Sequence, residues 1–273
     1  MKIIGIGDNV VDVYLDQHTF YPGGNCVNVL VSAKRNGAEK AAYLGIFGTD
    51  EAAEHVQHAL DQEGIPYDFS RTVIGKSGHP GVNLNEVGDR VFVGGPRNTV
   101  QHIVKLNLTE ADLEYIKNFD IAHVSRYSSL EGELEKLSKV IPISFDFSNG
   151  YSYEYLSKVC PFIKYGFFSG ADLSDEAIEE LLQVVGAYDL KVIGVTRGAK
   201  PAIFICNGRR YIQEPIETRI VDTMGAGDSF IGGFLRAFLD HEPVETTLVL
   251  AASSAAKTCG FHGGFGYPKA MTS

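Results

Sequence analysis

The chain has 273 residues, of which 44% are hydrophobic, so it can bury one large core. Its formal net charge of −10 excludes the basic footprint of a nucleic-acid-binding protein and opposes docking on an anionic membrane. No apolar run reaches the ~18 residues of a membrane-spanning helix, and the four scattered cysteines are typical of reduced thiols, so we expect a cytoplasmic protein.

The hydrophobic pattern predicts alternating strands and helices along most of the chain. A short apolar run at residues 2–7 is the first strand, and a helix over residues 25–36 follows, ended by Gly37. Further strands are expected at residues 41–47, 121–124, 141–147, 165–169 and 191–196, and further helices at residues 51–63, 109–117, 174–185, 229–239 and 248–258. This alternation indicates an α/β fold with a central, mostly parallel sheet flanked by helices on both faces.

Two segments depart from this alternation. Residues 10–22 and 78–95 have the pattern of β-strands without intervening helices, and Gly88-Asp89 suggests a hairpin turn in the second segment. Both segments are too short to form a core of their own. We therefore expect one domain over residues 1–273, with these strands as a small appended β-sheet.

The most informative motif is the run from Asp222 to Asp228, Asp-Thr-Met-Gly-Ala-Gly-Asp, which directly precedes an apolar helix. Free N–H groups at a helix N-terminus bind anions, and small residues let phosphate oxygens approach the backbone. An acidic side chain beside such a site suits a general base that acts on a hydroxyl attacking a phosphoryl group. The alternative is that Asp228 is an ordinary first-turn acid stabilised by the helix dipole.

Carboxylates also follow the first predicted strand, at Asp8 and Asp12. Because carboxylate oxygens accept hydrogen bonds from hydroxyl groups, both residues are candidates for sugar binding. Ligands of parallel α/β sheets bind at the carboxyl ends of strands, where these residues lie. For Asp12, a solvated loop acid is the alternative.

The segment that begins the first predicted helix contains two glycines and two asparagines. Gly23 and Gly24 would allow a ligand to approach the backbone closely, while the Asn25 and Asn28 amides can both donate and accept. Asn25 could equally be the N-cap of the helix.

These motifs resemble the two signatures of the ribokinase-type (PfkB) sugar kinases. Residues 222–228 match the C-terminal signature at every fixed position, and residues 23–28 and 43–50 resemble the N-terminal one. The resemblance implies a ribokinase-like fold in which the small sheet is a lid over the sugar and a possible dimer contact. It also implies that the amides of Gly225, Ala226 and Gly227 form an anion hole, and that Asp228 takes the proton from the sugar hydroxyl.

The same resemblance implies the nucleotide site and the cofactors, ATP and Mg²⁺. It assigns Thr196, Gly198 and Thr223 to the nucleotide, although Thr196 and Gly198 could also be an ordinary strand end. The family's Asn-x-x-Glu motif is replaced here by residues 169–172, so Asp172 is expected to reach magnesium through water. Alternatively, Asp172-Leu173-Ser174 simply precedes and caps the next helix. Activation by a monovalent cation is left open.

Within the family, the segments 89–92 and 145–148 resemble the fructoselysine kinases. An arginine in the lid, Arg90, would bind the carboxylate of an amino-acid-bearing sugar, with Arg97 and Arg126 as further candidates. Alternatively, Arg90 is an exposed charge that protects an edge strand. We therefore expect an ATP-dependent kinase of a small sugar, with fructoselysine O6 as the favoured acceptor. A kinase of fructose, ribose or a nucleoside, and a non-catalytic sugar sensor, are the alternatives.

Overall fold

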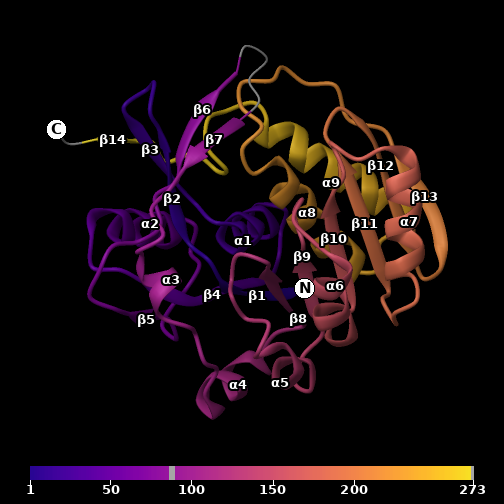
Figure 1. The fold of residues 1–273 in the computed structure, drawn as a ribbon, viewed down its shortest axis with the longest axis horizontal. Coiled ribbons are helices and arrows are strands. Elements are labelled where there is room, and N and C mark those ends of the chain that lie inside the picture. Colours follow the sequence, from indigo (N-terminus) through magenta and orange to yellow (C-terminus); the bar gives the residue numbers. More distant parts are fainter. Residues whose placement is uncertain (86–89, 272–273) are drawn as a thin grey trace.

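The computed structural model describes residues 1–85 and 90–271, and its main feature is a large, mostly parallel sheet (Figure 1). In spatial order, its strands in this part of the chain are β13 (Arg209–Gln213), β12 (Lys200–Cys206), β11 (Val192–Arg197), β10 (Tyr165–Ser169), β9 (Ile143–Asp146), β8 (Ile121–Ser125), β1 (Lys2–Gly7), β4 (Lys40–Phe47) and β5 (Arg71–Thr72). All neighbouring pairs from β5 to β11 are parallel, while β12 and β13 are antiparallel.

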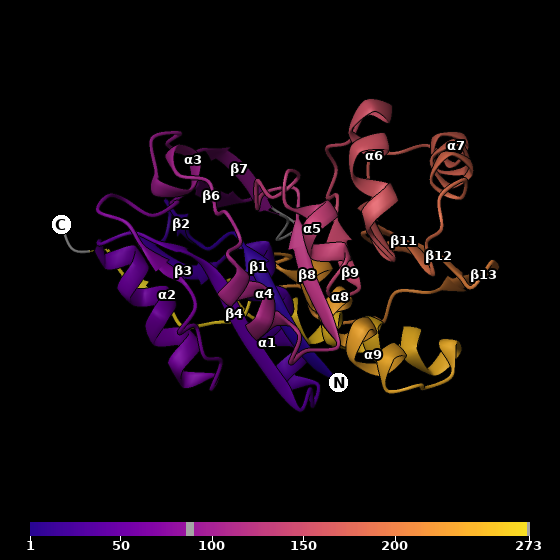
Figure 2. The same ribbon diagram turned by 90° about the horizontal axis from the view of Figure 1, so that it is seen from below.

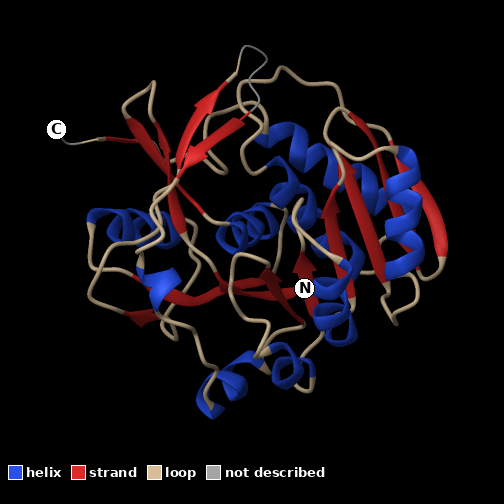
Figure 3. Ribbon diagram, in the orientation of Figure 1, coloured by secondary structure: helices blue, strands red, loops and turns tan. Residues whose placement is uncertain are grey.

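Helices cover both faces of this sheet (Figures 2 and 3). One face packs against α1 (Asn25–Arg35), α2 (Glu51–Gln62), α8 (Ala226–Leu239) and α9 (Val244–Thr258), and the other against α4 (Glu110–Ile116), α5 (Leu134–Ser138), α6 (Tyr153–Val159) and α7 (Asp175–Val185). Successive strand residues point into opposite cores: Phe167 of β10 enters the first and Phe168 the second. The predicted α/β architecture is therefore confirmed.

A second, smaller sheet stands beyond the carboxyl end of β1 (Figure 1). Its order is β14 (Lys269–Ala270), β3 (Thr19–Gly23), β2 (Val10–Tyr14), β6 (Gly81–Leu84) and β7 (Arg90–Gly94). The two segments predicted as β structure thus form a small sheet, and β14 was not predicted. The expected turn at Gly88-Asp89 lies outside the described residues.

The hairpin of β12 and β13 was also not predicted. Its turn is Asn207-Gly208, and both residues have positive φ, at 49° and 77°. Asn-Gly is the preferred pair for a two-residue turn of this kind, so the signal was present in the sequence. None of the described helices is both apolar enough and long enough to cross a membrane.

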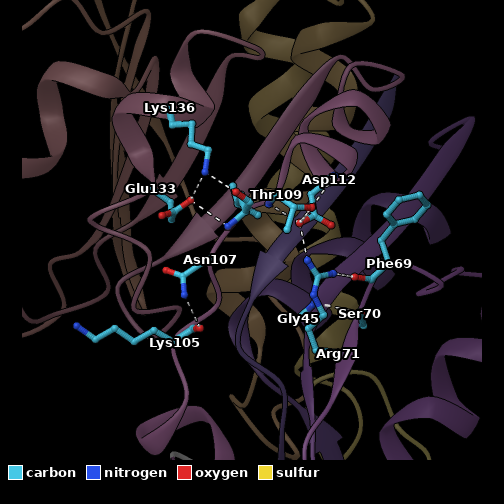
Figure 4. Close-up of polar contacts among 11 residues, drawn as sticks. Gly45, Phe69, Ser70, Arg71, Lys105, Asn107, Thr109, Asp112, Glu133 and Lys136 are labelled. Carbon is cyan, nitrogen blue, oxygen red and sulfur yellow. Dashed lines mark hydrogen bonds and ion pairs between the residues drawn. The ribbon is translucent and has the colours of Figure 1, made fainter.

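Polar contacts fix α4 to the edge strand β5 (Figure 4). Thr109 and Asp112 form a capping box at the start of this predicted helix, in which the Asp112 carboxylate accepts from the Thr109 backbone at 2.7 Å. The Arg71 guanidinium of β5 donates to the same carboxylate and to the Phe69 carbonyl. These bonds outweigh the effect of burial and lower the pKa of Asp112. The short edge strand is thereby tied to a helix on the second face of the sheet.

Among residues 1–85 and 90–271, two further short helical segments are α3 (Val100–Ile103), which follows β7, and the 3₁₀ turn at Cys160–Phe162, which follows α6.

Candidate active site

The N-terminus of α1 is held at the carboxyl end of β1 by Asp8. The Asp8 carboxylate accepts from the Asn25 backbone N–H at 2.6 Å and from the Ser125 hydroxyl at 2.8 Å. Gly24, with φ at 103°, occupies the N-cap position, and a Cβ there would lie 2.8 Å from the Asn9 Cα. Gly24 rather than Asn25 is therefore the N-cap, which leaves the Asn25 side chain for other contacts.

The Asn25 and Asn28 side chains both reach across to Asp228. The Asn25 Nδ2 donates to one Asp228 carboxylate oxygen at 2.7 Å, and the Asn28 Nδ2 donates to the other at 2.7 Å. The half-buried Asp228 lies in the first turn of α8, so the N-termini of two helices meet at its carboxylate. The predicted base and two of the predicted substrate ligands therefore belong to one cluster.

The loop that begins α8 has the geometry of an anion site. Gly225 is the N-cap with φ at 70°, and a Cβ there would lie 2.7 Å from the Gly264 Cα. The Ala226 N–H donates to the Thr223 carbonyl at 3.2 Å, whereas the structure gives the amides of Gly225 and Gly227 no acceptor among the described residues. Gly227 is exposed, and a Cβ there would meet nothing within 4 Å. Two backbone donors therefore stay available at this helix terminus.

Asp222, the first residue of the motif, is completely buried and joins the small sheet to this loop. One carboxylate oxygen accepts from the Met224 N–H at 2.9 Å, and the other accepts from the Gly263 N–H at 2.9 Å and from the Tyr14 hydroxyl. Burial, followed by the bond to Asp222, raises the pKa of Tyr14 well above its usual range. This role was missed, because Tyr14 is 208 residues away in sequence.

Asp12 is buried in β2 and faces the end of β3. A Cβ at Gly23 would lie 2.3 Å from an Asp12 carboxylate oxygen, so a side chain there would displace this carboxylate. Because Asp12 lies in a strand and is only 3% exposed, the solvated-loop alternative is wrong.

Two of the residues assigned to the nucleotide, Thr196 and Gly198, lie at the carboxyl end of β11, whereas Thr223 lies in the loop before α8; Asp172, assigned to the metal, follows β10. The Thr196 hydroxyl donates to the Phe168 carbonyl at 3.4 Å, and Gly198 forms the following turn with φ at 62°. Asp172 is exposed in the turn after β10, and Ser174, the last residue of the segment expected to precede and cap the helix, is the N-cap of α7. Because Mg²⁺ is usually held by one or two carboxylates with waters and substrate phosphates, an exposed carboxylate at this edge fits that ion.

Three buried polar residues beneath the cluster were not predicted. The Asn25 Nδ2 also donates to Asp146 at 2.6 Å, while the Asn25 Oδ1 contacts the His123 Nε2 at 3.0 Å. The His123 Nδ1 contacts the Ser144 hydroxyl at 2.9 Å. Burial lowers the pKa of His123 to about 3 and raises the pKa of Asp146 to about 6. The position of Asp146 at the end of a predicted strand was the available signal.

The candidate cations occupy different places. Arg90 begins β7 and pairs with Leu84, but its side chain lies outside the described part of the structure. Arg126 follows β8, is half-buried, and lies 5.6 Å from the centre of the Tyr127 ring. A Cβ at Gly150 would overlap the Arg126 guanidinium, so this glycine makes room for the cation. Arg97 is exposed.

The chain is similar to known carbohydrate kinases along most of its length. The model of the pfkB family carbohydrate kinases matches residues 2–142 and 165–268. Fructosamine kinase FrlD from Bacillus subtilis (strain 168) is 46% identical over 267 residues, which cover 98% of this chain and 94% of that protein. Fructoselysine 6-kinase from Escherichia coli (strain K12) is 28% identical over 259 residues, covering 94% and 97%.

The solved structure of Arabidopsis thaliana ribokinase complexed with ribose and ATP superimposes with a TM-score of 0.79. The alignment covers 96% of this chain and 93% of the ribokinase chain. At 20% identity this similarity concerns the fold, and it confirms the ribokinase-like architecture.

Proposed function

Because the chain belongs to the pfkB family of carbohydrate kinases, we propose that it transfers the γ-phosphoryl group of ATP to a hydroxyl of a sugar or sugar derivative. The observation that carries this proposal is the position of Asp228, whose two carboxylate oxygens are held by Asn25 and Asn28 beside the free amides of the α8 N-terminus. A base and an anion site must lie side by side for a hydroxyl to attack a phosphoryl group.

In the proposed reaction, Asp228 orients the acceptor hydroxyl and accepts its proton as the new O–P bond forms. The amides of Gly225 and Gly227 bind the transferring phosphoryl oxygens, and the Ala226 amide joins them if it exchanges its long bond to Thr223. Mg²⁺ would neutralise phosphate charge when bound, with Asp172 as the nearby carboxylate that we assign to it. Thr196, Gly198 and Thr223 are proposed to contact the nucleotide.

We propose that residues 1–273 form one domain whose small sheet is a lid over the sugar. Asp12 and the backbone at Gly23 and Gly24 would contact sugar hydroxyls from the lid side, and Asp8 would hold α1 and share in binding. Exclusion of water by such a lid favours transfer to the sugar over hydrolysis of ATP. The cytoplasm, which supplies ATP, is the proposed compartment, and the four cysteines are free thiols.

The acceptor that we favour is a fructosamine such as fructoselysine, phosphorylated at its 6-hydroxyl. The relatives named above support this choice, because their names specify fructosamine and fructoselysine. A fructosamine bears the carboxylate of its amino acid, and a half-buried arginine without an ion pair among the described residues, Arg126, lies at the carboxyl end of β8. Arg90 and Arg97 remain further candidates for this carboxylate.

The test is ADP release with Mg-ATP across fructoselysine, fructosylglycine, fructosylglycine amide, fructose, ribose and a nucleoside. We expect turnover on fructosamines, with the free carboxylate preferred over its amide. Asp228→Asn should keep sugar binding and lose about 10²–10⁴ in kcat, the usual contribution of a general base. Near wild-type turnover of Asp228→Asn would exclude its role as the base. Preference for fructose or ribose would exclude the fructosamine assignment, and binding without turnover would favour a sugar sensor.

A further inference from the structure

A buried chain of hydrogen bonds runs from the large sheet to the proposed base. Ser144 of β9 contacts the His123 Nδ1, the His123 Nε2 contacts the Asn25 Oδ1, and the Asn25 Nδ2 contacts Asp228. His123 is completely buried and Ser144 is inaccessible, so neither touches solvent. The register of the parallel strands places His123 directly beside Ser144.

The direction of the hydrogen bonds in this chain is fixed by its carboxylate end. Because carboxylates only accept, the Asn25 Nδ2 must face Asp228 and the Asn25 Oδ1 must face the imidazole. His123 must therefore carry its proton on Nε2, and its Nδ1 must accept from the Ser144 hydroxyl. If the Asn25 amide were reversed, an oxygen would face a carboxylate, which is repulsive. A neutral His123 of one tautomer is thus what holds the amide in its productive orientation.

The second N–H of the same amide donates to Asp146. The Asn25 Nδ2 donates to Asp146 at 2.6 Å as well as to Asp228 at 2.7 Å, so both of its N–H groups are used. Asp146 is itself fixed by the Ser148 N–H, which donates to its other oxygen at 2.8 Å. The position of the Asn25 side chain is therefore determined by β8, β9 and α1 together, and it transmits that position to Asp228 on α8.

We propose that His123, Ser144 and Asp146 are positioning residues for phosphoryl transfer, which act on Asp228 through the Asn25 amide. The proposal rests on the kinase function proposed above. None of the three needs to touch the sugar or ATP for this role. A misplacement of the base by about 1 Å can cost up to about 10²-fold in rate, which sets the size of the expected effect.

The first test is independent of turnover. The ¹⁵N NMR shifts of the His123 ring should show the neutral Nε2–H tautomer in the wild-type protein, and Asn25→Ala should remove the acceptor that selects it. A wild-type His123 in the Nδ1–H tautomer would overturn the proposal whether or not the protein is a kinase. A protein with the expected tautomer that turns over no sugar would instead contradict the proposed function alone.

The second test compares kcat and KM for His123→Leu and His123→Gln. Leu removes both hydrogen bonds, so we expect kcat to fall about 10- to 100-fold with little change in the KM for ATP. Gln can donate to Asn25 and accept from Ser144, so it should restore most of kcat. In an Asn25→Ala background, His123→Leu should cause no further loss, because its effect passes through Asn25.

His55 provides a matched control. It is also a buried histidine, but its Nε2 contacts the Tyr267 carbonyl at 2.8 Å, away from the network. His55→Leu is expected to change thermal stability without the kcat-specific loss. Two outcomes would overturn the proposal. One is that His123→Leu lowers kcat by the same factor in the wild-type and Asn25→Ala backgrounds. The other is that His123→Gln loses as much kcat as His123→Leu.

Discussion

Burial shifts the pKa values of His123 and Asp146 in opposite directions, although both residues contact the same asparagine. Desolvation disfavours the charged form of each group, so it lowers the pKa of His123 to about 3 and raises the pKa of Asp146 to about 6. For Asp146, the Ser148 and Asn25 donors and the Arg126 charge act against this shift, whereas the Asp8 charge adds to it. The two residues therefore give opposite contributions to the dependence of stability on pH.

The expected signs follow from proton binding. Folded His123 binds fewer protons than the unfolded chain between pH 6.5 and about 3, so its contribution is present above pH 6.5 and is lost as the pH falls. At pH 5 the titration of His123 should have lowered the free energy of unfolding by about 2 kcal/mol. Between pH 3.8 and about 6, Asp146 binds more protons in the folded protein than in the unfolded chain. Its ionised carboxylate therefore lowers the free energy of unfolding above this window, and this cost shrinks as the pH falls through it.

We predict that, on going from pH 7.5 to pH 5, the free energy of unfolding of His123→Gln rises by about 2 kcal/mol relative to that of wild type, because the variant lacks the titrating ring. Asp146→Asn loses one of the two oxygens that accept from Asn25 and Ser148, so its pH dependence is the test: relative to wild type, its free energy of unfolding should fall by about 2 kcal/mol on going from pH 7.5 to pH 4.5. Denaturant unfolding of the three proteins at these pH values measures both effects. Variants whose stabilities run parallel to wild type across the range would contradict the assigned shifts.

The sequence predicted part of this cluster. Asp228, Asn25 and Asn28 belong to recognisable motifs, so all three were site candidates before the structure showed that they meet. His123 could not be assigned, because Ile-Ala-His-Val-Ser has the pattern of a core strand and its partners depend on strand register. Asp222 belonged to a motif, yet its contact with Tyr14 required the small sheet to be placed over the loop.

At the scale of single elements, the start of α8 contains two glycines with different constraints. Gly225 has φ at 70° and lies against Gly264, so a side chain there would be strained whether or not ligand is present. Gly227 has no neighbour within 4 Å of a Cβ, so the free protein would accept alanine there. A methyl group at Gly227 would, however, intrude on the space that the proposed phosphoryl group needs.

We predict that Gly225→Ala lowers the free energy of unfolding by about 1–3 kcal/mol and also abolishes turnover. Gly227→Ala should leave stability unchanged or raise it by up to about 1 kcal/mol, since alanine is the better helix former. Its kcat/KM for ATP should nevertheless fall at least about 10-fold. Thermal unfolding and ADP-release kinetics of the pair check this, and a fully active Gly227→Ala would exclude this amide from the anion site.

Elements that depend on local pattern were predicted more completely than those that depend on partners. The helix predicted over residues 109–117 begins as expected, at α4, where the Thr109–Asp112 capping box depends on only four consecutive residues. Strand β14 has two residues and exists only through pairing with β3, so no periodicity could reveal it. The β12–β13 hairpin had a turn signal, but two antiparallel strands in succession depart from the alternation of strands and helices on which the prediction was based.

At the scale of the whole molecule, each sheet has an edge strand with exposed apolar residues. β7 ends the small sheet and exposes Val91, Phe92 and Val93, while β13 ends the large sheet and exposes Ile212. An apolar edge strand is a template for pairing with another chain unless something covers it. Because the β7 residues are consecutive, both faces of that strand are apolar, and we propose that a second copy of the chain pairs there to form a dimer.

The prediction is that the wild-type protein sediments as a dimer at micromolar concentration and that Phe92→Lys sediments as a monomer. A charge on an edge strand opposes edge-to-edge pairing, and Phe92 is 54% exposed, so the monomer should remain folded. Ile212→Lys is the matched control, because it places the same charge on the edge of the other sheet, where the side chain is 62% exposed. A dimeric Ile212→Lys together with a monomeric Phe92→Lys would assign pairing to β7. A monomeric wild type would remove the interface, and a dimeric Phe92→Lys would place it elsewhere.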